Sequence, residues 1–94
     1  MYYKNLLEQS LKELNISYKE NKLTYTFEKP LAITIATPQT YFSFKSQSLK
    51  LVSDDDFLYM DFDNDFIFKT QAPFVSFAPA KNNSMLIRLS HNKF

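Results

Sequence analysis

The first fifteen residues alternate apolar and polar positions with the period of an α-helix. The apolar positions recur at three- and four-residue spacing, at Tyr2, Tyr3, Leu6, Leu7, Leu11 and Leu14. Charged residues fill the opposite side, so the segment has one apolar stripe. This pattern predicts an amphipathic helix over about residues 2–14. Asn15 follows it, and asparagine tolerates the left-handed conformation in which many helices end.

From residue 16 onward the apolar positions recur every second residue, which is the alternation of a β-strand. Residues 16–18 and 23–27 alternate on either side of a polar break at residues 20–22, and this predicts a β-hairpin. Further strands are expected at residues 31–37, 41–46, 48–53, 57–62, 65–70, 74–78 and 85–90. They are separated by Pro30, Pro38, Gln47, clustered aspartates, Pro73 and the segment from Pro79 to Asn83. The predicted fold is α+β, with the N-terminal helix packed on an antiparallel β-meander or a small, partly closed barrel of about six to eight short strands. The helix leucines should face sheet residues such as Ile33 and Ile35.

Length and composition narrow the class of protein further. A chain of 94 residues has room for one hydrophobic core, so we expect a single domain over residues 1–94. The chain has no glycine, which excludes nucleotide cofactors held by a P-loop or a dinucleotide-binding fingerprint. It has no cysteine, so a cytoplasmic location is expected. Charged residues interrupt the leucines near the N-terminus, and we therefore expect neither a signal peptide nor a membrane span.

Two predicted strands are apolar on both faces, because residues 57–62 and 66–68 contain aromatic and aliphatic side chains at consecutive positions. Such strands are either covered on both sides or exposed to a partner. One helix covers one face of a small sheet. We therefore expect most of these side chains in the core and some aromatic rings available for binding.

Charge is distributed very unevenly along the chain. The six aspartates lie between residues 54 and 65, in a segment without lysine or arginine, which therefore carries a charge of −6. Eleven basic residues against four glutamates give the remainder +7, so the net charge of +1 conceals a dipolar molecule.

Candidate catalytic and metal sites are weak in this sequence. Asp61, Asp63 and Asp65 have the spacing of the first ligands of a calcium loop, but Phe66 stands where that loop needs glycine and Ala72 where it needs glutamate. A carboxylate pair of the glycosidase kind needs a concave pocket that a chain of this size frames poorly. His91 is the one histidine, close to the C-terminus, and serine and lysine occur in no recognised motif. We predict no catalytic residue, metal or cofactor, and hence no enzyme.

Two interpretations of the acidic segment compete. Aspartates are good turn residues, so they form solvated loops at either end of the strand at residues 57–62. Alternatively, they imitate the negative charge of a nucleic-acid backbone and bind a basic groove on a partner protein. In that second case the contact surface comprises Asp54, Asp55, Asp56, Phe57, Tyr59, Asp61, Phe62, Asp63 and Asp65. Residues 66–94 contain basic residues and no acidic ones, and together with Phe74 and Phe77 they suggest a weaker alternative, a surface that stacks nucleic-acid bases.

In its size, its composition and its acidic cluster from Asp54 to Asp65, the chain resembles the small inhibitor proteins of bacteriophages and other mobile elements, of which anti-CRISPR proteins are the best-known group. The resemblance implies a non-catalytic protein that binds a host nuclease effector, or its complex with guide RNA, in the cytoplasm. Inhibition would block guide loading, target binding or activation. The alternatives are a small nucleic-acid-binding accessory or regulatory protein and an immunity protein that neutralises a toxin.

Overall fold

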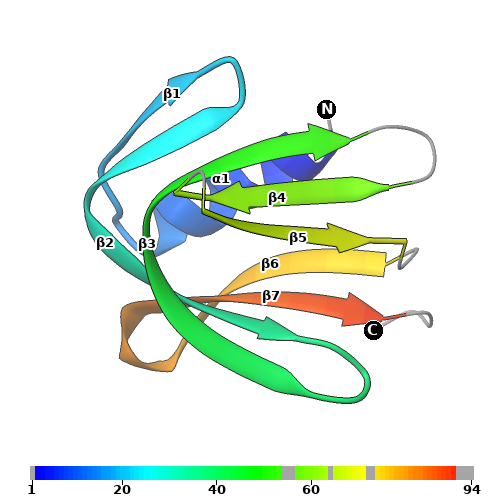
Figure 1. Cartoon of the computed structure of the whole chain (residues 1–94). Helices are drawn as coiled ribbons and strands as arrows, with labels where there is room; N and C mark the ends of the chain where they lie inside the picture. The colour runs from blue at the N-terminus through cyan, green and yellow to red at the C-terminus, as the bar shows by residue number, and fades with distance from the viewer. Residues whose placement is uncertain (1, 54–56, 64, 72–73, 91–94) are drawn as a thin grey trace.

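A computed structural model describes residues 2–53, 57–63, 65–71 and 74–90. Within these ranges the chain forms one α-helix, seven strands and a short 3-10 helix: α1 (Tyr2–Glu13), β1 (Tyr18–Asn21), β2 (Thr24–Ala36), β3 (Tyr41–Ser53), β4 (Leu58–Phe62), β5 (Phe66–Thr70), β6 (Phe74–Ala80), η1 (Lys81–Asn83) and β7 (Ser84–Ser90). The strands make one curled sheet, a half-barrel with α1 lying behind it (Figure 1). The α+β fold class predicted from the sequence is confirmed. Among the described residues, no helix is long and apolar enough to cross a membrane.

The sheet is mixed in direction. Its strand order is β5-β4-β3-β2-β7-β6, with β1 paired to β2 outside this path. All neighbours are antiparallel except β2 and β7, which run parallel with Ile33 opposite Met85. The expectation of purely antiparallel pairing therefore differs from the structure at one pair. No tight turn joins β2 to β7, so the chain connection does not force these strands to run in opposite directions.

β2 and β3 are long strands that bend without ending. The ladder between them passes from the pair Thr26 and Ser48 to the pair Leu31 and Ser46, so residues 27–30 of β2 lie opposite residue 47 alone. The sequence-based prediction of strand breaks near Pro30 and at Gln47 is wrong, because these positions form a bulge within continuous strands. Proline fits there, since the ladder is already interrupted and no N–H is required.

Because the chain has no glycine, other residue types adopt the left-handed backbone conformation at its turns. Positive φ angles occur at Asn15, Lys22, Leu23, Asp63, Asn82 and Asn83. Four of these six residues are asparagine or aspartate, the types that tolerate this conformation best. Asn15 ends α1 as predicted, with its N–H donating to the carbonyl of Lys12 at 3.1 Å.

The helix packs on the sheet through its leucines, as predicted. Leu7 and Leu11 are fully buried in the same core as Ile33 and Ile35, while Leu6 and Leu14 pack at its border. Among the strands, α1 lies closest to β6. The Ser10 hydroxyl donates to the Phe77 carbonyl of β6 at 2.7 Å in a buried hydrogen bond, which fixes the position of the helix along that strand.

A polar network joins the exposed side of α1 to the core. The Glu8 carboxylate accepts hydrogen bonds from the Lys4 ammonium and from the Tyr25 hydroxyl, each at 2.7 Å. Lys4 and then Tyr25 hold the pKa of Glu8 below its ordinary value, while burial raises the pKa of the Tyr25 hydroxyl. Tyr25 is fully buried, so Glu8 satisfies a hydroxyl that would otherwise lack a partner.

Leu11→Asp is expected to destabilise the fold by about 3–5 kcal/mol, because it removes a core leucine and buries an unpaired charge. Gln9→Asp, on the exposed side of the same helix, should change stability by no more than about 0.5 kcal/mol. Thermal and urea unfolding measure both. A Leu11→Asp protein that unfolds like the Gln9→Asp control would contradict the docking of α1.

Glu8→Gln should reduce stability at neutral pH, and its difference from the wild type should shrink in acid. The folded pKa of Glu8 lies below its ordinary value of 4.5. Its charge-dependent stabilisation is therefore complete above that value and is lost as the pH falls through the folded pKa. Urea unfolding midpoints from about pH 7 to about pH 2 test this. A difference that stays constant over this range would show that the charge of Glu8 plays no part.

Candidate functional site

The predicted contact residues of β4 divide between the two faces of the sheet. Tyr59 and Asp61 are half-buried and alternate with the buried residues Leu58 and Met60, so they lie on the face that points away from the core. Phe62 is 1% exposed and belongs to the core, where it supports the surface from beneath. Asp54, Asp55 and Asp56 lie outside the described residues.

Neighbouring strands extend this exposed side of β4. Across the ladder, Tyr59 pairs with Val52 and Lys69, and Asp61 pairs with Lys50 and Ile67. Val52 and Ile67 are exposed, Ile67 to 62%. The surface is named the outer face below and consists of Lys50, Val52, Phe57, Tyr59, Asp61, Ile67 and Lys69.

Lys69 organises the aromatic part of the outer face. Its ammonium lies 3.9 Å from the centroid of the Phe57 ring and 5.5 Å from that of Tyr59. The two rings are themselves 5.9 Å apart. A cation above aromatic rings is attracted to their negative faces, so Lys69 orders both rings at the surface.

Asp61 is the least satisfied polar residue of this surface. Its Oδ1 atom is buried, and no described residue donates a hydrogen bond to it. A carboxylate oxygen shielded from water without a donor is unfavourable in the free protein. The residue as a whole is only half-buried, so Asp61 still places negative charge on the outer face beside Ile67.

Asp63 has a structural role that the sequence did not reveal. Its carboxylate accepts hydrogen bonds from the backbone N–H groups of Gln47 and Ser48, at 2.9 and 2.8 Å, and its own N–H donates to the Ser48 carbonyl at 3.1 Å. It has a positive φ of 58°. Asp63 thus ties the turn between β4 and β5 to the bend of β3, in keeping with the interpretation of aspartates as turn residues.

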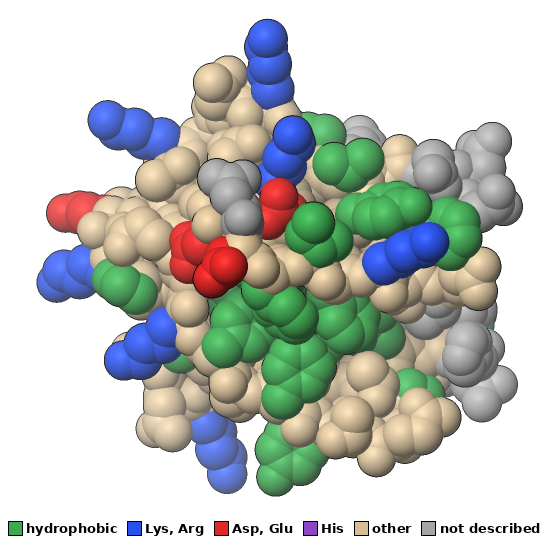
Figure 2. All heavy atoms as spheres, in the orientation of Figure 1, with side chains coloured by type: hydrophobic (Ala, Val, Ile, Leu, Met, Phe, Trp, Pro, Cys, Tyr) green, Lys and Arg blue, Asp and Glu red, His purple; other side chains and the backbone are tan. Residues whose placement is uncertain are grey.

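Sequence reasoning missed a groove between β3 and β5. The groove has a volume of about 300 Å³ and is lined by Phe42, Phe44, Lys45, Phe62, Asp63, Asp65 and Phe66. Phe66 lies 5.8 Å from Phe42 and 5.4 Å from Phe44, measured between ring centroids. Figure 2 shows a hydrophobic area below β5 with acidic side chains at one border. The signal in the sequence was the alternation of Phe42 and Phe44 with serine, but it did not tell which strand they would face.

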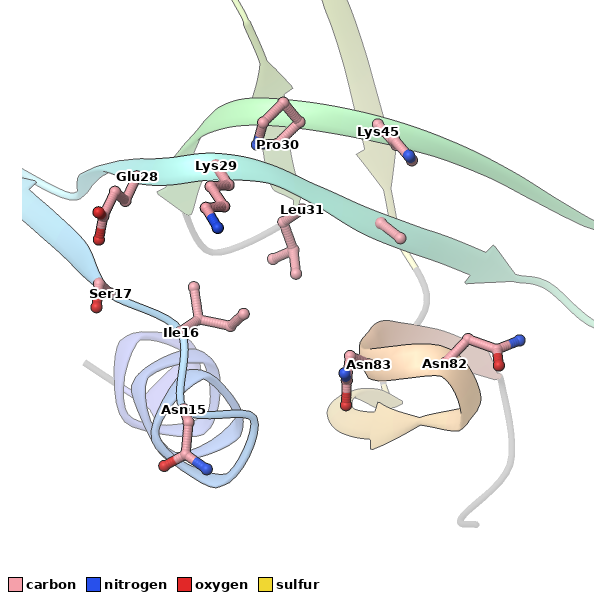
Figure 3. A pocket seen from close by; sticks show the side chains of 11 residues that line it. Asn15, Ile16, Ser17, Glu28, Lys29, Pro30, Leu31, Lys45, Asn82 and Asn83 are labelled. Atoms are coloured by element: carbon pink, nitrogen blue, oxygen red, sulfur yellow. The ribbon is translucent and has the colours of Figure 1, made fainter.

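A second, more polar pocket lies at the C-terminal end of α1 (Figure 3). It has a volume of about 500 Å³ and is enclosed by the loop after the helix, by β2 and by η1. Its lining contains Ser17, Lys29 and Lys45, but Figure 3 shows the Ser17 hydroxyl turned away from both lysines. A serine nucleophile needs a base within hydrogen-bond reach, and this arrangement provides none.

Metal binding and base stacking find little support in the described residues. No group of three histidine, cysteine, aspartate or glutamate side chains gathers there to hold a metal ion. Phe77, one of the two aromatics considered for stacking on nucleic-acid bases, is buried in the core. Only Phe74 of that pair is exposed, so a stacking platform of successive rings is not formed.

Asp63→Ala should destabilise the protein by about 2–3 kcal/mol, because two backbone donors lose their acceptor and alanine disfavours a left-handed conformation. Asp61→Asn is the matched control on the same hairpin. It removes the charge of a half-buried side chain at constant size, so stability should stay within about 0.5 kcal/mol of wild type. Urea unfolding compares the two, and equal losses would contradict this division of roles.

No family model, no curated protein and no solved structure matches this chain. The outer face, the groove and the distribution of charge described above are therefore the features that bear on function.

Proposed function

We propose that this protein is a non-catalytic inhibitor that acts in the cytoplasm and binds a host nucleic-acid-handling effector, such as an RNA-guided nuclease, by direct protein contact. The contact surface is the outer face together with the acidic segment at residues 54–65. The observation that carries the proposal is the position of the half-buried Asp61 directly opposite the exposed side chain of Ile67 on adjacent strands.

This combination suits a basic protein surface. Aromatic and aliphatic side chains supply the apolar centre that binding hot spots need, and here Phe57, Tyr59 and Ile67 occupy that position. Carboxylates beside them steer a positively charged partner and exclude negatively charged ones. Proteins that handle nucleic acid carry basic grooves for the phosphate backbone, and an acidic surface with an apolar centre competes for such a groove.

The uneven charge distribution would help this protein to bind its partner in one orientation. The acidic segment carries −6 against +7 on the remainder, so the molecule has a strong dipole. A dipole orients the protein during approach and raises the association rate without adding contacts. Lys50 and Lys69 lie within the contact surface itself, so this orientation would turn only other basic residues away from the partner's positive groove.

Cleavage by a purified RNA-guided nuclease of the host should fall to zero at a fixed molar ratio of this protein, because a blocking protein is consumed stoichiometrically. Titration of the protein against the nuclease and its guide RNA gives this ratio. Continued loss of activity at substoichiometric amounts would indicate turnover and end the non-catalytic proposal. A mobility shift with free nucleic acid, in the absence of any protein partner, would instead favour the nucleic-acid-binding alternative.

The acidic contact can be tested by charge removal at constant size. A triple variant with Asp54→Asn, Asp55→Asn and Asp56→Asn should associate with the nuclease more slowly and with a weaker salt dependence. Screening shortens the Debye length from about 10 Å at 0.1 M to about 3 Å at 1 M salt. The matched control replaces Glu13, Glu20 and Glu28 with glutamine, which removes the same charge elsewhere. Identical association rates for the two triple variants would show that the aspartates are solvated loops.

A further inference from the structure

The sheet has three open edges, and β5 is the least protected of them. β1, β5 and β6 each pair with a single neighbour. Open edges expose backbone N–H and C=O groups and are usually protected by charges, proline or a covering element. β1 carries exposed Lys19 and Glu20, while β6 contains Pro79 and lies against α1. β5 also carries an exposed lysine, Lys69, but it exposes Phe66 to 38% and Ile67 to 62%.

The side chains along the β5 edge are complementary to those of a second copy that runs antiparallel to it. In an antiparallel pairing with Ile67 opposite Ile67 of a second copy, Asp65 lies opposite Lys69 and Phe66 lies opposite Phe68. Each of these two pairs occurs twice, once on either side of Ile67. Opposite residues in an antiparallel ladder share one face of the sheet. Two ion pairs and an isoleucine pair would therefore lie on the outer side, and four phenylalanines on the inner side.

We propose that two copies of this protein associate through antiparallel pairing of their β5 edges in this register. The arrangement has a twofold axis at Ile67, so the same surface serves both copies and the assembly closes as a dimer. The sheet then continues from one half-barrel into the other. The outer faces then lie side by side, and Asp65, Ile67 and Lys69 would serve this pairing as well as the contact surface proposed above.

The groove beneath β5 provides room for the inner side chains of the second copy. Phe66 and Phe68 of each chain would face one another along the border of the apolar area below β5 (Figure 2). Rings of Phe42 and Phe44 already contact Phe66 from β3. Rings added at this border would extend an existing cluster and cover apolar surface that the single chain exposes.

Lys69 is exposed on the outer side of β5, and its ammonium would have to turn from the rings on the β4 side to form the intermolecular ion pair. Its ammonium lies over the Phe57 ring, which holds the side chain on the outer side of the strand. An ammonium has three donors, and contact with a ring face leaves donors for a carboxylate. Asp65 is exposed and immediately precedes β5, so both charges are accessible at the edge.

Sedimentation equilibrium tests the pairing through charge reversal. The wild type should shift with rising concentration from 11.1 kDa toward twice that mass. Asp65→Lys and Lys69→Asp each place like charges opposite one another at both ends of the ladder, and each should weaken self-association by at least about tenfold. An equimolar mixture of the two variants restores opposite charges at both ends, so it should associate as the wild type does.

The outcomes separate this register from any other contact. Circular dichroism and thermal melting verify that both variants fold, and Lys81→Asp, an exposed change on η1, should leave the self-association unchanged. A wild type that stays at 11.1 kDa at millimolar concentration overturns the proposal. So does association of either single variant at wild-type strength, or a mixture that remains monomeric.

Discussion

The bend shared by β2 and β3 is the constraint on which the rest of the structure depends. Where residues 27–30 lie opposite residue 47, both strands change direction together and the sheet curls. The curl brings the first half of β3 across from β5, so Phe42 and Phe44 contact Phe66 although β3 and β5 are not hydrogen-bonded neighbours. A flat sheet of the same strands would leave these rings in water.

Polar contacts hold this bend on both sides. Gln47 donates its side-chain amide to the Phe27 carbonyl, and Asp63 accepts the N–H groups of residues 47 and 48. The bulge would otherwise leave these backbone groups without partners. Asp63 of the acidic segment therefore has a structural role in this bend. Asp61 and Asp65 do not contribute to the bend, and they lie at the surface.

Local sequence patterns predict those features that depend on a residue's neighbours along the chain. The helix bounds, the left-handed Asn15 and most strand positions follow from local periodicity, and they agree with the structure. Pro30 and Gln47 have the local pattern of strand ends, because local patterns do not distinguish a bulge from a turn. The parallel pairing of β2 with β7 and the groove lined by Phe42 depend on contacts between distant segments, which periodicity does not specify.

The position of α1 also bears on how the chain acquires its fold during synthesis. The helix is synthesised before the strands, but the hydrogen bond of Ser10 is made to Phe77, 67 residues later, and β2 obtains its parallel neighbour only with β7. At translation rates of about 5–20 residues per second, several seconds pass between the synthesis of the helix and that of its partner strand. During this time the apolar stripe of the helix has no strand to pack on. Until then the β2–β3 hairpin is the main long-range structure available to the nascent chain. The last third of the chain therefore completes the core. A chain that ends before β6 would leave the helix leucines exposed, and they could then associate with apolar surfaces of other molecules.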